Sequence, residues 1–168
     1  MLNKSLKALI LDKLNSNDYS CGRDTIFVKF CSHFGVKLKT NIDDAESALD
    51  TQKKYHKINA APYCWGPIFE IRYKFYQSSY WACGGREINV LYGYFTEVVE
   101  VFAFVDAKQG YDYDKFEETV SDPDLLDTPE YLSLRDECEK KGLEYCDPFV
   151  ANVGRLKRGK RTLVYLDF

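Results

Sequence analysis

Three oxygen-bearing side chains follow one another near the C-terminal end of the sequence. Asp147 is followed five positions later by Asn152, and the apolar run of residues 163–166 leads into a second carboxylate, Asp167. Carboxylate and amide oxygens suit Mg²⁺, which prefers one or two carboxylates together with phosphate oxygens. The spacing from Asp147 to Asn152 alone is weak evidence, because a chain this rich in aspartate contains such spacings by chance. The basic turn and apolar run that come next predict a hairpin, and this strengthens the pattern.

A cation that could meet a phosphate lies much earlier in the chain. The run G-V-K-L-K at 35–39 predicts a strand, and Lys37 stands in it between two apolar residues. A lysine in such a strand either points to solvent or serves a site, and the two alternatives are evenly balanced. The next segment predicts a helix, because capping oxygens at 41–44 precede apolar residues at a 3.6-residue period. This helix carries Glu46 and Gln52.

The elements that must position these residues follow from periodicity and turn signals. A short amphipathic helix is expected over 3–14, and strands are expected over 25–30, 66–76 and 88–105. Residues 106–127 are acidic and predict a solvated loop with a short helix. Thr128-Pro129-Glu130 predicts a helix start, and Gly142 predicts its end. The pattern indicates an α+β fold forming one compact unit, with a sheet and helix over 1–100 and a smaller part over 101–168.

Length and composition fit one globular domain or one small two-lobed unit. The chain has 168 residues, of which 45% are hydrophobic and 29% charged, and its formal net charge of −3 argues against a dedicated nucleic-acid binder. Six scattered cysteines without a C-x-x-C pair, and only two histidines, argue against structural zinc. Neither a signal peptide nor a membrane-length apolar run is recognisable. We therefore expect a cytoplasmic protein with reduced thiols and no membrane contact.

The order Asp147, Asn152, hairpin, Asp167 resembles the catalytic core of the protein-kinase-like superfamily. The order strand, strand, helix, strand, strand before it resembles the small lobe of that family, so the resemblance covers most of the chain. It implies a two-lobed fold that binds ATP and Mg²⁺, in which an antiparallel N-lobe sheet is crossed by one helix and the C-lobe is much reduced. Asp147 would orient the attacking hydroxyl, and Asn152 with Asp167 would hold the metal.

The same resemblance implies roles for residues in the first hundred positions. Lys37 would contact the ATP phosphates, with Glu46 as its carboxylate partner. Gln52 could take the place of Glu46, and the lysine would then lack a charged partner. Glu97 and Val99 stand where the family's hinge offers backbone groups to the adenine edge.

Several features depart from the family pattern and count against catalysis. The segment that should be a glycine-rich loop contains only Gly22, and Tyr145-Cys146 replaces the His-Arg pair before the catalytic aspartate. Pro148 restricts Asp147 to extended conformations. The sequence stops at Asp167-Phe168, so we expect neither an activation segment nor a platform for a protein substrate.

Three interpretations remain open. The first is a pseudokinase that binds a partner protein, with or without Mg-ATP. The second is an active minimal kinase that transfers the γ-phosphate to a protein or small-molecule hydroxyl, and the third is an α+β interaction module without a nucleotide site. Small chains of this type resemble those carried by bacterial viruses. The basic turn at 155–161 could contact nucleic acid or an acidic partner, but a solvated turn is the preferred interpretation.

Overall fold

The computed structural model describes residues 2–21, 25–77, 86–101, 123–144, 152–156 and 163–166. Its first half is built on a five-stranded antiparallel sheet with the strand order β1-β2-β3-β5-β4. The strands are β1 (Ser20–Cys21), β2 (Thr25–Lys29), β3 (Phe34–Lys39), β4 (Cys64–Gln77) and β5 (Arg86–Glu97). Strands β3 and β4 are consecutive in sequence but separated by β5 in the sheet, and the helix α2 (Ile42–His56) lies in their connection.

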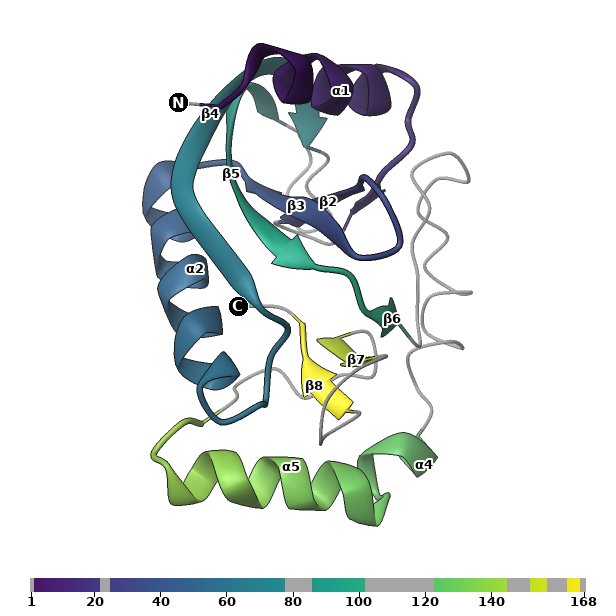
Figure 1. Ribbon diagram of the computed structural model, residues 1–168, viewed down its shortest axis with the longest axis vertical. Coiled ribbons are helices and arrows are strands. Elements are labelled where there is room, and N and C mark those ends of the chain that lie inside the picture. The colour runs from purple at the N-terminus through teal and green to yellow at the C-terminus, as the bar shows by residue number, and fades with distance from the viewer. Residues whose placement is uncertain are drawn as a thin grey trace.

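Two helices cover opposite faces of this sheet (Figure 1). Helix α1 (Lys4–Asn15) buries Ile10 and Leu14 against a core that includes Val36 and Leu38 of β3. Helix α2 packs against the other face, where its apolar stripe forms a smaller cluster with residues of β4 and β5. Successive side chains of a strand point to opposite faces, so Lys37 lies on the α2 side.

Local sequence explains where these helices begin. The side chain of Asn3 accepts a hydrogen bond from Ser5 N at 2.9 Å, and Asn41 accepts one from Asp44 N at 2.7 Å. A short polar side chain at this position satisfies a backbone N–H that the first turn of a helix leaves without a partner. Thr128 does the same for α5 (Pro129–Lys140), with Pro129 in the first helical turn.

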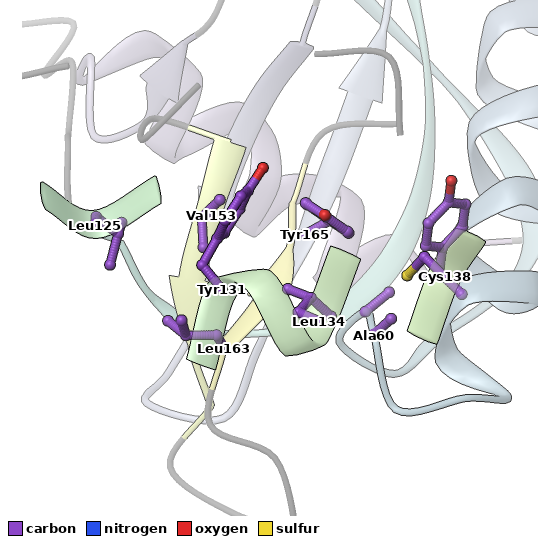
Figure 2. Close-up of a cluster of buried hydrophobic side chains, with 10 residues drawn as sticks. Ala60, Leu125, Tyr131, Leu134, Cys138, Val153, Leu163 and Tyr165 are labelled. Atoms are coloured by element: carbon purple, nitrogen blue, oxygen red, sulfur yellow. The ribbon is translucent and has the colours of Figure 1, made fainter. Parts of the chain in front are cut away.

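The second half is smaller and is built around a three-stranded antiparallel sheet. Strands β6 (Glu100–Val101), β7 (Val153–Arg155) and β8 (Leu163–Tyr165) lie in that order. The short helix α4 (Pro123–Leu126) and α5 lie against them (Figure 1). The core between α5 and β8 contains Tyr131, Leu134 and Tyr165, and Figure 2 shows these side chains filling the space between the helix and the hairpin.

The predicted α+β class is confirmed, as are most of the predicted elements. The expectation of one continuous strand over 88–105 was wrong, because β5 ends at Glu97 and Glu100–Val101 pairs in the second sheet. The β-branched and aromatic residues on both sides of Glu97 and Glu100 suit one continuing strand, and this pattern hid the change of sheet. Lys37 is 7% exposed, so the alternative in which this lysine points to solvent was wrong. No helix in the described ranges is long and apolar enough to cross a membrane.

Substitution of Gly35 tests how tightly β2 and β3 pack. A Cβ atom at this position would lie 2.4 Å from the carbonyl oxygen of Val28, a backbone atom that cannot rotate away. Gly35→Ala should therefore lower the free energy of unfolding by about 1–3 kcal/mol in urea denaturation. Gly142→Ala is the matched control: a Cβ there meets nothing within 4 Å, and its φ of +67° alone costs about 1 kcal/mol. A Gly35→Ala protein more stable than Gly142→Ala would contradict this packing.

Candidate functional site

Lys37 joins the front sheet to the C-terminal hairpin. Its ammonium group donates a hydrogen bond to the backbone carbonyl of Leu166, a residue 129 positions away in sequence. Burying a charged group is costly unless polar groups compensate for lost water, and a carbonyl oxygen is one such group. The side chain therefore does not snorkel to solvent but points to the end of β8.

Asn152 lies at the same end of the hairpin. Leu166 N donates to Asn152 O at 2.8 Å, directly beyond the pair of Val153 with Tyr165 in the β7–β8 ladder. Lys37, Asn152 and the residue immediately before Asp167 are thus brought together, although they come from distant parts of the chain. Asp167 and Asp147 lie outside the described residues.

Gln52, not Glu46, faces the sheet from α2. Gln52 is completely buried, whereas Glu46 is exposed. The two residues are six positions apart, which on a helix with about 100° per residue places them roughly 120° from each other. Only one can share the buried stripe, which consists of Ala45, Ala48, Leu49, Gln52 and Tyr55. The predicted pairing of Lys37 with Glu46 receives no support from this arrangement, and Gln52 occupies the buried face.

A closed hydrogen-bond network surrounds Gln52. Its Oε1 accepts from the hydroxyl of Tyr94 at 3.0 Å. Its Nε2 donates to Thr96 Oγ1 at 2.8 Å and to the carbonyl of Pro62 at 3.0 Å. Tyr94 is the cross-strand partner of Lys37, so this network lies beside the buried lysine. The sequence analysis did not single out Tyr94 and Thr96, although their alternate spacing on β5 places both on the face that α2 covers.

Cys64 shows how strongly this region is shielded from water. Burial raises the pKa of its thiol to about 11, and the positive charges of Lys37 and Lys53 oppose the shift only in part. The Sγ atom donates to the carbonyl of Leu49 at 3.8 Å. The thiol therefore stays protonated at neutral pH and is not a nucleophile.

The predicted hinge residues lie where the chain leaves the first sheet. Glu97 N donates to the carbonyl of Tyr63 at 2.8 Å, so this N–H is not free for a ligand. Across the described ranges, Val99 N–H makes no hydrogen bond. A Cβ at Gly154 would come 2.8 Å from Val99 Cγ2 and 2.9 Å from Leu166 Cδ1. The missing side chain at Gly154 lets the hinge approach the same residue that Lys37 contacts.

For the expected Mg²⁺, the described residues supply one of the predicted ligands, Asn152, which is half-buried beside β7. Among them no group of three His, Cys, Asp or Glu side chains could hold a metal ion. The donor chemistry of Asn152 and its closeness to the backbone before Asp167 fit an oxygen-liganded ion.

Comparison with known proteins found no relative: no protein-family model, curated protein or solved structure matches the chain.

The Gln52 network predicts a large difference between two substitutions in α2. Gln52→Leu should lower the free energy of unfolding by about 2–3 kcal/mol, because it removes the buried hydrogen bonds that Gln52 makes with Tyr94, Thr96 and Pro62. Glu46→Ala, on the exposed side of the same helix, should change it by less than about 0.5 kcal/mol. Urea denaturation of both variants measures the difference, and equal effects would show that the helix is rotated from this position.

The raised pKa of Cys64 predicts a pH dependence of stability above pH 9. An exposed cysteine thiol has a pKa of 9.0, whereas burial raises the pKa of the Cys64 thiol in the folded state to about 11. Because the unfolded chain loses that proton first, stability should fall as pH rises between these values. The difference in unfolding free energy between the wild type and Cys64→Ala should shrink by up to about 1.4 kcal/mol per pH unit. A difference that is constant from pH 8 to 10.5 would contradict the shielding of this thiol.

Proposed function

We propose that the chain is a protein-kinase-like nucleotide-binding protein that holds Mg-ATP between its two sheets and serves as a pseudokinase for a partner protein. The observation that carries the proposal is the hydrogen bond from Lys37 to Leu166. It brings the one cation expected to meet the phosphates to the residue before Asp167, the expected metal ligand. Further support comes from the strand order β1-β2-β3-β5-β4, with a single helix crossing between β3 and β4.

Each residue of the proposed nucleotide site would have a distinct role. The ammonium of Lys37, oriented by Leu166, would contact phosphate oxygens in a region that excludes water and so strengthens charge attraction. The N–H of Val99 would donate to the adenine edge. Asn152 would hold Mg²⁺ together with Asp167, and the metal would neutralise charge on the phosphates.

The residue that α2 places beside Lys37 distinguishes this chain from an active kinase. Gln52 places an amide, not a carboxylate, on the buried face beside Lys37, and the amide already bonds to three neighbours. The lysine would therefore be oriented by the hairpin instead of by an ion pair to this helix. This difference favours nucleotide binding over rapid phosphate transfer, since kinases require the lysine–glutamate pair.

A minimal phosphotransferase is the second candidate, favoured by the approach of Lys37 to Asn152 through Leu166. It would need Asp147 as the group that orients an attacking hydroxyl. The two candidates share the same ATP site and differ only in that step. Loss of phosphate transfer in Asp147→Asn, with ATP binding retained, would identify the transferase.

Binding of Mg-ATP is the direct test. Isothermal titration calorimetry should detect binding by the wild type, and the melting temperature should rise by roughly 5–10 °C at a hundredfold excess of ligand over Kd. Lys37→Met keeps the apolar stem and removes the charge, so it should weaken ATP binding by about 10–100-fold. Lys29→Met, on the exposed side of β2, is the matched control and should bind ATP as the wild type does.

A second variant tests the same site in case Lys37→Met does not fold. Asp167→Asn should weaken ATP binding in the presence of Mg²⁺ but leave metal-free binding unchanged, because the carboxylate acts on the metal. A wild-type protein that binds no Mg-ATP at millimolar concentration would overturn the proposal and leave the α+β interaction module.

A further inference from the structure

The five-stranded sheet has a notch where β3 leaves it. Strand β3 pairs with β5 only as far as Lys39, whose cross-strand partner is Tyr92, and the chain then turns into α2. Strand β5 begins earlier, at Arg86, and its first residues pair with β4 alone. Figure 1 shows β5 continuing past the turn from β3 into α2. Within the described part of the chain, residues 87–91 therefore have no neighbouring strand on one side.

This open edge of β5 carries backbone groups that a strand could bond. In an antiparallel sheet, alternate residues of a strand direct their N–H and C=O groups to opposite neighbours, so about two or three of residues 87–91 direct both groups into the notch. Outside the β4–β5 ladder, none of these groups bonds to a described residue. An extended peptide offers donors and acceptors at the same repeat, so it complements this edge.

A groove of about 410 Å³ follows the same edge. Its described lining consists of residues 40–42 on one side and of residues 87–90 with Tyr92 on the other. Successive side chains of a strand point to opposite faces of the sheet. A groove that touches four consecutive residues of β5 therefore runs along the backbone edge, where a ligand can reach the N–H and C=O groups.

Ile42 supplies an exposed apolar surface in this groove. It lies three and seven positions before Ala45 and Leu49, so it extends the stripe of α2 that faces the sheet. Ala45 is 0% exposed and Leu49 is 6% exposed, whereas Ile42 is 44% exposed. The helix begins beside the notch, and no described strand covers Ile42 there. An apolar side chain of an added strand would bury it.

The outer edge of β4 is less suited to strand addition. Its register with β5 is irregular between Trp65 and Phe69 and again between Arg72 and Phe75, and the extra residues lie in β4. Pro67 also lies in this strand and has no N–H to donate. Bulges and proline protect edge strands from pairing. Residues 87–91, E-I-N-V-L, contain no proline, so the notch is the more favourable place for a strand.

The charges around the notch favour a basic peptide. Glu87 lines the groove but lies 2.7 Å from the ammonium of Lys74, which largely neutralises it. Asp43 follows Ile42 directly, is exposed, and makes no ion pair within the described ranges. Lys39 is 6% exposed and is not among the residues that line the groove. The carboxylate of Asp43 therefore attracts a cation to this end of the groove.

We propose that the notch binds an extended segment of a partner protein, which adds to β5 as a further strand. Its backbone would bond to the open edge of residues 87–91, and one apolar side chain would cover Ile42. A lysine or arginine at one end would face Asp43. The notch lies at the start of β5, whereas the predicted hinge follows its end, so this interaction needs no nucleotide. Peptide binding and Mg-ATP binding can therefore be tested separately.

A short alternating peptide, acetyl-Lys-Val-Thr-Val-Thr-Val-Lys-amide, is the probe. Titration should shift the ¹⁵N resonances of residues 86–92. Methylation of every backbone nitrogen of this peptide keeps its side chains but removes its N–H donors, so it should weaken binding at least about 10-fold. Equal affinities of the two peptides would overturn the proposal. So would a lack of binding by the unmethylated peptide at millimolar concentration.

Amide hydrogen exchange locates the added strand. In the free protein, the alternate amides of residues 87–91 that face the notch should exchange quickly, and saturating peptide should slow them about 10-fold or more. Protection that falls along Cys64–Gln77 instead would place the peptide on the outer edge of β4 and overturn the proposal. Slow exchange of all amides of residues 87–91 in the free protein would also overturn it, because the edge would already be covered.

Ile42→Ser tests the apolar contact. It should weaken peptide binding by about 3–10-fold, because the added strand then buries less apolar surface. Its melting temperature should change little, since Ile42 is nearly half exposed in the free protein. Leu9→Ser is the matched control: Leu9 is 41% exposed on α1, so this variant should bind the peptide as the wild type does. Equal losses in both variants would contradict a site beside α2.

A peptide in which glutamate replaces both lysines tests the contribution of charge. The wild type should bind it about 2–5-fold more weakly than the lysine peptide, because Asp43 repels it. Asp43→Asn should reduce this preference. Tighter binding of the glutamate peptide by the wild type would contradict the orientation toward Asp43.

Discussion

The two halves of this molecule depend on a buried lysine that is held by a backbone carbonyl. Burial of Lys37 removes hydration from its ammonium group, and the hydrogen bond to the carbonyl oxygen of Leu166 compensates for part of the lost hydration free energy. The bond can form only if β8 ends beside β3, and the close approach of Val99 and Leu166 over Gly154 secures this position. A second link reinforces it, since Tyr165 N donates to the carbonyl of Ala60 at 2.9 Å. Sheet, helix connection and hairpin are therefore fixed by neighbouring contacts at one place.

The same region explains why α2 presents an amide there. The carbonyl of Pro62 accepts a hydrogen bond from Gln52 Nε2, so a carboxylate at this position would set two acceptors against each other. The hydroxyls of Tyr94 and Thr96 complete the network without any charge. A neutral network that is fully satisfied tolerates burial far better than an isolated ion does. The helix thus stabilises the sheet by hydrogen bonds, and the orientation of the lysine is left to the hairpin.

The sequence was informative wherever one local pattern decided the structure. Capping oxygens at Asn41 and Thr128 marked the starts of α2 and α5, and the alternation of β4 was regular enough to place it. The break between β5 and β6 could not be found this way, because Val98 and Val99 are β-branched residues that suit a continuing strand and fit either sheet. The choice between Glu46 and Gln52 depended on the rotation of α2 about its axis, which tertiary packing sets.

Burial of polar side chains was harder still to predict. Lys37 stands between Val36 and Leu38 in a pattern that equally suits a solvent-facing lysine, and only the arrival of β8 from the far end of the chain decides the matter. Tyr131 was also hard to place. In the sequence it is one member of an apolar helical stripe with Leu134 and Cys138, and its edge-on contact with Tyr165 depends on the same arrival of β8.

One strand, β8, connects the core beside α5 to the Lys37 site. Tyr165 packs into the core beside α5, whereas the carbonyl of the next residue, Leu166, accepts the hydrogen bond of Lys37. Tyr165 also meets Tyr55 of α2, with ring centroids 6.0 Å apart, so the strand is held from both sides. Any change that moves the backbone of β8 would disturb both places together. The Lys37 site can therefore be tested only by side-chain substitutions that leave this backbone in place, such as removal of a single charge.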